Sequence, residues 1–266
     1  MFATANSWTR LPLGRRVAAL MTLLVTGLIL AAMRCVATDL GSTDRARLLD
    51  RSQQIFSAAQ KRFASEPTNT AAAWEFARAG FERAEFSTNN AERAALAVQG
   101  IDACRQALAR DAKLAPAHHY LGMNLGQLAR TKLLGALKMV GEMERAFKAA
   151  ATLDERFNHA GPDRCLGSLY YEAPVIGSVG SRTKARKHFE RAAELAPEFP
   201  ENRLNLAEAY LKWREKKLLQ RELDALNKLW PAAQTNLAGA DWEMSWVDWS
   251  QRIKKLRKDA ATFLTR

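Results

Sequence analysis

The side chains best suited to catalysis or metal binding are scattered along this sequence. Two of the four histidines, His118 and His119, are adjacent, and on a helix they would point about 100° apart. Cys104 and Cys165 occupy apolar helical positions, as expected for buried free thiols, and no metal-site spacing occurs. Since no Ser/His/Asp arrangement, phosphate loop or isolated acid pair is present either, we predict a protein that is not an enzyme and needs no cofactor or metal.

The polar side chains best placed for binding lie near glycine-rich helical stretches. Asn124 and Arg164 fall where helices would be crowded, so each must be paired or must face a cavity. We interpret both as cavity residues. Tyr170 is expected in the core, so Tyr171, one position further on, points elsewhere and could reach the rim of a binding site.

A nearly uncharged loop, EAPVIGSVGS at 172–181, interrupts an otherwise charged and helical sequence. Pro174 fixes its first bend, and Val175 and Ile176 would expose apolar area unless something covered them. The neighbour could be another inserted segment of the chain, a second subunit or a partner protein. Pro174, Val175 and Ile176 therefore join Asn124, Arg164 and Tyr171 as candidate ligand-binding or partner-binding residues.

The rest of the sequence must build the elements that position these residues. Between residues 43 and 265 the apolar spacing is almost wholly helical, and no stretch alternates as a strand would. Helix breakers divide this region into hairpin-sized helix pairs. They fall at Pro67, Asn89-Asn90, Pro116, Gly161-Pro162, Pro174, Pro197, Pro200 and Pro231.

A repeat accounts for the helix pairs. The stretch TKARKHFERAAELAPEF resembles the second helix of a tetratricopeptide repeat, and LGSLY at 166–170 and LAEAY at 206–210 resemble its first helix. Small residues such as Gly167 and Ala207 would let the two helices of a repeat cross closely. We therefore predict an all-α, tetratricopeptide-like helical solenoid of about four helix pairs with flanking helices.

Three of the four units carry insertions at the same edge. In the last unit, Ala207 and Leu219 are separated by 12 positions, as is usual between the first-helix small residue and the second helix. In the earlier units the same interval is 20, 21 and 18 positions, from Gly80 to Gly100, Gly122 to Met143 and Gly167 to Ala185. Insertions that recur on one edge lie together in space, so the 172–181 loop should belong to a shared rim.

Three neighbouring features are the GPDRCLGSLY segment at 161–170, the proline and glycine loop that follows it, and the KARKHFERAAELAP helix at 184–197. Together they resemble the T-component (TatT-type) family associated with TRAP transporters. The resemblance implies a periplasmic, all-helical protein that can assemble as a homotrimer, has a pore or cavity through each protomer and associates with the transporter's solute-binding protein. A small organic-acid or apolar ligand in that cavity would fit the same family. The residues that carry the resemblance are Gly161, Pro162, Arg164, Leu166, Gly167, Tyr170, Ala173, Pro174, Gly177, Ala185, Phe189, Ala192, Pro197 and Asn202.

The N-terminal region predicts export. Residues 17–33 form an uncharged apolar run with three arginines before it and Arg34 after it, as in a signal peptide or membrane anchor. Cleavage after Ala37 is compatible with the sequence. Members of the resembled family are typically lipoproteins, but Met33 and Arg34 precede Cys35 where a lipobox has small residues. Cleavage, lipidation at Cys35 and retention of the anchor all stay open.

Charge and the C-terminal pattern complete the prediction. The net charge of +12 favours anionic partners, and export argues against nucleic acid.

We expect residues 1–37 to be a signal peptide or anchor, 38–69 a leading helix, 70–231 the repeats and 232–266 a C-terminal capping helix. Its apolar stripe comprises Trp242, Trp246, Trp249, Ile253, Leu256 and Phe263, and its solvated basic face Arg252, Lys254, Lys255, Arg257 and Lys258.

Two functions fit these observations. In the first, the protein is a noncatalytic periplasmic subunit that binds a TRAP solute-binding protein through its cavity and rim. In the second, it is a general tetratricopeptide scaffold that captures extended peptides or envelope proteins in its concave groove.

Overall fold

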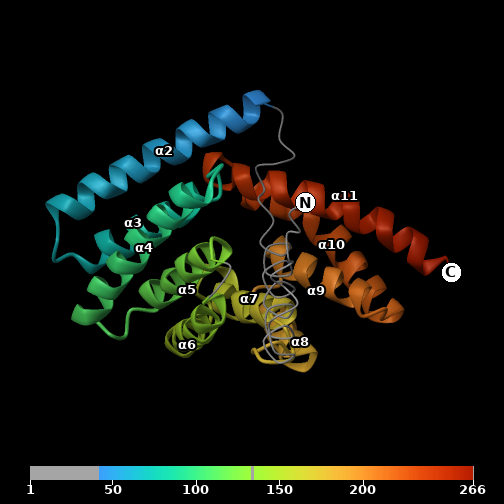
Figure 1. Ribbon diagram of the computed structural model, residues 1–266. Coiled ribbons are helices and arrows are strands. Elements are labelled where there is room, and N and C mark those ends of the chain that lie inside the picture. The colour runs from blue at the N-terminus through green and yellow to red at the C-terminus, as the bar shows by residue number, and fades with distance from the viewer. Residues whose placement is uncertain (1–41, 133–134, 266) are drawn as a thin grey trace, which may run out of the picture.

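The computed structural model describes residues 42–132 and 135–265, and these fold into ten α-helices and one short 3-10 helix, η3 (Figure 1). The predicted signal peptide or anchor, with Cys35, lies outside the described residues. None of the described helices is both long and apolar enough to span a bilayer. The elements are α2 (Ser42–Ser65), α3 (Thr70–Ala84), α4 (Asn90–Arg110), α5 (Ala115–Arg130), α6 (Ala136–Leu153), α7 (Phe157–Glu172), α8 (Arg182–Leu195), α9 (Pro200–Lys212), α10 (Lys216–Asn236), η3 (Ala240–Trp242) and α11 (Glu243–Leu264).

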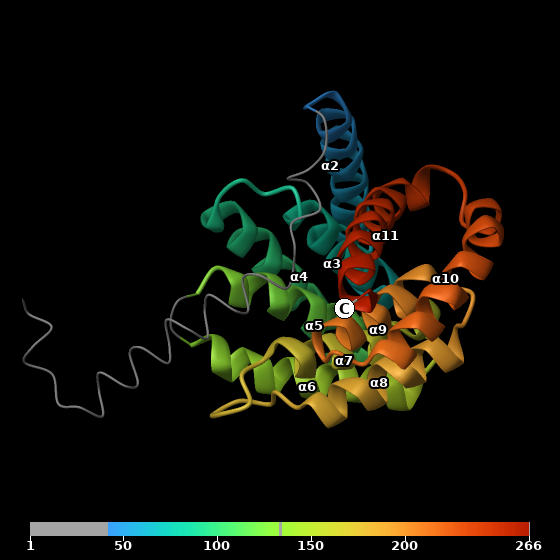
Figure 2. The ribbon, with the colours of Figure 1, turned by 90° about the vertical axis from the view of Figure 1, so that its right-hand side faces the viewer.

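The helices pack in sequential pairs that stack into a curved solenoid (Figures 1 and 2). The pairs are α3 with α4, α5 with α6, α7 with α8, and α9 with α10, and each first helix also contacts the first helix of a neighbouring pair. This arrangement confirms the prediction of an all-α solenoid built from helix pairs.

Close crossing within the pairs depends on glycine. A Cβ added at Gly122 would lie 2.5 Å from the ring of Phe147, and one at Gly167 would lie 2.4 Å from the ring of Phe189. Both phenylalanines are buried in the core. The first-helix glycine and the second-helix phenylalanine therefore fit together as the repeat pattern predicts, because any larger residue would separate the two helices.

Helix boundaries follow local signals with one exception. The side chains of Asn69, Asn89 and Ser181 cap the N-termini of α3, α4 and α8 by accepting backbone N–H groups. The break predicted at Gly161-Pro162 is present as a left-handed turn at 158–160, and Pro162 lies in the first helical turn after it, where proline is tolerated. Pro231 was predicted to break a helix but lies exposed inside α10.

The C-terminal helix covers the end of the solenoid. Trp249, Ile253 and Leu256 are buried, and α11 packs against α9. Arg252 was predicted to be solvated on the basic face, but its side chain is only 13% exposed and pairs with Glu208. That prediction was wrong because the basic face of α11 turns partly toward α9. Lys254, Lys255, Arg257 and Lys258 are exposed.

The first and last described helices meet and close the curve of the solenoid (Figure 1). Arg47 forms an ion pair with Glu243, and Arg51 bonds Asp241 at 2.8 Å. A small apolar cluster beneath these pairs joins Leu48 of α2 to Phe86 and to Met244 of α11. The concave side is therefore enclosed by segments almost 200 positions apart in the sequence.

Candidate binding cavity

The concave side of the solenoid encloses a cavity of about 1090 Å³. Its walls come from α2, α3, α5, α6, α7, α8, α9, η3 and α11, so it belongs to the whole superhelix and not to one repeat. The lining combines aromatic rings with charges of both signs. Among the described residues, the lining cations are Arg51, Arg78, Arg164, Lys212, Arg252 and Lys255, and the lining acids are Glu82, Glu85, Glu172, Glu201, Glu208, Asp241, Asp248 and Asp259.

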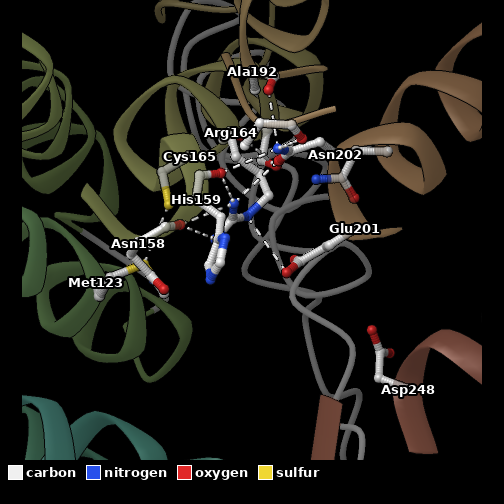
Figure 3. Close-up of polar contacts among 12 residues, drawn as sticks. Met123, Asn158, His159, Arg164, Cys165, Ala192, Glu201, Asn202 and Asp248 are labelled. Carbon is white, nitrogen blue, oxygen red and sulfur yellow. Dashed lines mark hydrogen bonds and ion pairs between the residues drawn. The ribbon is translucent and has the colours of Figure 1, made fainter. Parts of the chain in front are cut away.

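Arg164 is the most connected charged residue on the α7 wall (Figure 3). Its guanidinium donates hydrogen bonds to the carbonyl of His159 at 3.0 Å and to Oδ1 of Asn202 at 3.1 Å. It also pairs with Glu201 at 3.4 Å and lies 4.9 Å from the centre of the Phe199 ring. The side chain is almost fully buried, so these partners replace the water that its charge would otherwise require.

The contacts of Arg164 hold an unusual backbone turn. Asn158, His159 and Ala160 have φ angles of 50°, 55° and 60°, which is the left-handed region that side chains other than glycine rarely adopt. The carbonyls of Asn158 and His159 both accept from Arg164, and the His159 carbonyl also accepts from Nδ2 of Asn202 at 3.1 Å. Such strain persists only where surrounding contacts hold it, which is the case here.

A second network lines the wall formed by α9 and α11. Arg252 bonds Glu208 at 2.9 Å and Asp248 at 3.2 Å and also donates to Asn205. Burial raises the pKa of Asp248, and the positive charge of Arg252 partly offsets this effect. The pKa of Arg252 is raised: burial acts to lower it, but the neighbouring carboxylates, led by Glu208, outweigh that effect. The network therefore holds opposite charges together as fixed ion pairs.

His119 lies at the base of the cavity and is fully buried. Neither ring nitrogen has a hydrogen-bond partner among the described residues, and the ring packs against Tyr120, Phe147 and Phe157. Burial, with a smaller contribution from the Arg164 charge, lowers the pKa of His119 to about 3. The imidazole is therefore neutral at physiological pH and serves as a packing group.

Of the six predicted binding residues, Arg164 and Tyr171 line the cavity. Tyr171 is half-buried, and Nζ of Lys212 lies 4.2 Å from the centre of its ring. Both residues sit on α7, seven positions apart, which on a helix places them on the same face. They therefore form one polar and aromatic strip along the wall.

Asn124 does not face the cavity, contrary to our interpretation. It is fully buried between helices, and its Nδ2 donates to the carbonyls of Ala77 at 3.0 Å and Tyr120 at 2.8 Å. A Cβ at Gly100 would lie only 2.4 Å from Asn124 Oδ1. The asparagine thus fills the space that the glycine leaves and links neighbouring repeats.

The three predicted loop residues also lie outside the cavity. Val175 and Ile176 are 74% and 73% exposed, and Pro174 is half-buried at the base of the loop. No described segment of the chain covers the two aliphatic side chains. Of the three neighbours left open by the sequence, the described part of the chain itself is therefore excluded.

The α11 wall was not predicted from the sequence. Asp248 and Arg252 lie four positions apart on a tryptophan-rich helix, a pattern that equally fits a surface ion pair. Glu201 and Glu208 lie on α9 and carry no distinguishing local signal. Only the spacing of Trp242 and Trp249, which puts aromatic side chains beside these charges, hinted at a wall and not a solvated face.

The described residues contain no group of three or more His, Cys, Asp or Glu side chains that could hold a metal ion. Cys104 and Cys165 are free thiols, and burial raises the pKa of both. The cavity is lined by paired charges and aromatic rings, which suit binding.

Comparison with solved structures places the fold among tetratricopeptide proteins. The chain resembles the thermophilic TPR protein TTC0263 of Thermus thermophilus, with a TM-score of 0.53 and 17% identity over 84% of this chain and 95% of that one. It also resembles PilF of Pseudomonas aeruginosa, with a TM-score of 0.50 and 16% identity over 94% of this chain and 90% of that one. No protein-family model and no curated protein sequence matches. At these identities the likeness establishes the tetratricopeptide-like fold and nothing further.

Proposed function

We propose that this chain is a noncatalytic tetratricopeptide scaffold of the cell envelope that holds a segment of a partner protein in its enclosed concave cavity. The cavity is the observation that carries the proposal. At about 1090 Å³ its volume lies just above the range of roughly 300–1,000 Å³ that small-molecule sites occupy. Tetratricopeptide arrays present their concave side to extended peptides, so an enclosed concave surface is the expected binding site of this fold.

The charge of the cavity suggests the chemistry of the segment. Its lining has eight carboxylates and six Lys and Arg side chains, and Arg130 behind the lining pairs with Glu85, so the lining carries a slight acidic excess although the whole chain has a net charge of +12. A local excess of carboxylates attracts positive charge and disfavours small anions. This favours a partner segment containing Lys or Arg over the organic acid that the family resemblance suggested, and an apolar ligand stays compatible with the aromatic lining.

A narrower form of the proposal makes the partner a TRAP solute-binding protein and the assembly a homotrimer. It is supported by the family resemblance that residues 161–202 carry and by the presence of a cavity within a single protomer. Arg164 and Tyr171 would contact the partner or ligand from the cavity wall, and Pro174, Val175 and Ile176 would act from the rim.

Photo-crosslinking in cells tests both forms. Tyr171 replaced by p-benzoylphenylalanine should form an adduct with one envelope protein, because this position lines the cavity. The control is the same replacement at Val98, which is exposed on α4 away from the cavity and should give no adduct. Mass spectrometry then identifies the partner: a solute-binding protein supports the narrower form, and another envelope protein supports the general scaffold.

The segment that crosslinks can then be synthesised as a peptide and titrated against the purified chain. If its charge is recognised by the acidic lining, Asp248→Asn should weaken binding of a basic peptide, and the effect should shrink at high salt. Equal adducts at Tyr171 and Val98, or none at Tyr171, would contradict binding in the cavity.

A further inference from the structure

The loop between α7 and α8 presents the two most exposed large aliphatic side chains in the described part of the chain. Val175 and Ile176 are 74% and 73% exposed, whereas the next, Leu137, is 46% exposed. The loop projects past the ends of the neighbouring helices (Figure 2). Adjacent aliphatic side chains at the tip of a projecting loop are unfavourable in water, so a function is expected for them.

The backbone of the loop is fixed at its base. The Gly180 N–H donates to the Pro174 carbonyl at 3.0 Å, and the Ser181 N–H donates to the Tyr170 carbonyl at 2.9 Å. A Cβ at Gly180 would lie 2.0 Å from the Ala173 carbonyl oxygen, so only glycine permits this closure. The loop therefore holds its two aliphatic side chains outward in a preformed arrangement.

Basic side chains surround the base of the loop. Arg182 and Arg186, at the start of α8, both pair with Glu215, which places the α9–α10 turn beside the loop. That turn brings further cations next to aromatic rings. The cations of this region are Lys148, Arg182, Lys184, Arg186, Arg214 and Lys216, and its acids are Glu144 and Glu215; Lys212 and Glu172 line the cavity instead.

We propose that the α7–α8 loop docks on the surface of an anionic lipid bilayer. Val175 and Ile176 enter the interface between headgroups and acyl chains, and the surrounding cations face the lipid phosphates. Apolar insertion combined with attraction to anionic headgroups is the usual basis of peripheral membrane binding.

Three arguments favour a bilayer over a protein as the occupant. A stable protein interface buries about 800 Å² on each partner, much more than two side chains provide, whereas a bilayer accepts a small insertion. The cations beside the loop exceed the acids by six to two, and the membrane phosphates supply the complementary charge. The apolar run at 17–33, which the sequence predicts to be a signal or an anchor, would if retained keep the loop close to a membrane.

The test places an environment-sensitive fluorophore on the loop of the full-length chain. In a Cys35→Ser/Cys165→Ser background, Ile176→Cys is labelled with NBD; Cys165 is replaced because it is only half-buried and lines the cavity, whereas Cys104 is fully buried. The protein is bound to vesicles of phosphatidylcholine and phosphatidylglycerol at three to one. We expect NBD emission to rise and to be quenched by spin-labelled lipid.

The matched control carries NBD on Leu153→Cys, an exposed aliphatic position at the end of α6. The whole of α7 separates this position from the loop in the sequence, and its NBD emission should not change. Lys184→Gln and Lys216→Gln should each lower the loop-insertion equilibrium about fivefold on anionic vesicles. With the label on Val175→Cys, Ile176→Ser should lower the emission change while circular dichroism stays the same.

Three outcomes would overturn the proposal. Equal emission changes at positions 176 and 153 would show general adsorption of the chain to lipid. Equal changes on pure phosphatidylcholine would remove the role of charge. No change on either vesicle, with a change on adding the crosslinked partner protein instead, would make the loop a protein contact.

Discussion

Adding a single methyl group at two equivalent glycines should change stability in opposite directions. Gly80 and Gly167 both occupy the first-helix position that faces a second helix. At Gly80 a Cβ would lie 3.5 Å from the Leu96 carbonyl and 3.7 Å from the Phe56 ring, which is ordinary contact. At Gly167 it would lie 2.4 Å from Phe189 Cδ1. We therefore expect Gly80→Ala to stabilise the fold and Gly167→Ala to destabilise it.

The magnitudes follow from two opposing effects. Alanine is favoured over glycine inside a helix by about 0.5–1 kcal/mol at both positions. At Gly167 the methyl group must also displace the buried Phe189 ring, and overpacking of this kind costs about 1–3 kcal/mol. The free energy of unfolding should thus rise by about 0.5–1 kcal/mol in Gly80→Ala and fall by up to about 2.5 kcal/mol in Gly167→Ala.

Thermal unfolding followed by far-ultraviolet circular dichroism measures the difference. For a chain of this size about 1 kcal/mol shifts Tm by about 2–4 °C, so the two variants should be separated by several degrees. Lys258→Ala, on the exposed face of α11, serves as a neutral control within about ±0.5 kcal/mol.

A double-mutant cycle locates the cause. Because the clash is with one ring, Phe189→Leu should remove most of the additional cost of Gly167→Ala, giving a coupling energy on the order of 1 kcal/mol. If Gly167→Ala raised Tm as much as Gly80→Ala does, the close crossing of α7 and α8 would not be what requires glycine, and the reasoning would fail.

Two further predictions concern the cavity walls. Arg164→Met should lower the free energy of unfolding, measured in urea, by about 2–4 kcal/mol, because Glu201, Asn202 and the left-handed turn lose their hydrogen-bond donor. The control, Arg105→Met, removes an exposed ion pair with Glu142 and should lower it by less than about 1 kcal/mol. Equal losses in the two variants would contradict the structural role of Arg164. The pKa of His119 is about 3 in the folded state, whereas its ordinary value is 6.5. As pH falls, the unfolded chain therefore takes up the proton first. The contribution of His119 to the free energy of unfolding is fully present above about pH 6.5 and is lost progressively below it. Between about pH 6.5 and pH 5 the free energy of unfolding should fall with a slope that approaches about 1.4 kcal/mol per pH unit. His119→Phe should remove this contribution, as measured by urea denaturation at each pH. An unchanged slope would show that His119 is not buried in its neutral form.

Much of the fold could be predicted from the sequence because its signals are local. The spacing of Gly167 and Phe189, like that of Gly122 and Phe147, specifies which helix faces meet, and Asn89 marks a helix start through a hydrogen bond to a backbone N–H three residues on. The exception is Pro231, which lies exposed inside α10 although proline is usually costly within a helix. The domain boundaries at 37, 69 and 231 stay predictions.

The candidate site was predicted only in part. Arg164 and Tyr171 lie on the helix whose repeat pattern was clearest, and both line the cavity. Asn124 was misplaced because a buried asparagine that bonds two carbonyls and one that faces a cavity look the same in sequence. For Val175 and Ile176, the sequence indicated that a neighbour should bury these side chains. It did not indicate that both stay exposed in the described part of the chain.

The sequence by itself determined the helices, their pairing and the close contacts within each repeat, since these depend on residues a few turns apart. Only the tertiary structure decided that the concave side is closed, because curvature accumulates from small rotations between repeats before Arg51 can meet Asp241. The same accumulated curvature turns Arg252 toward Glu208, 44 positions earlier, and converts an apparently solvated charge into part of a cavity wall.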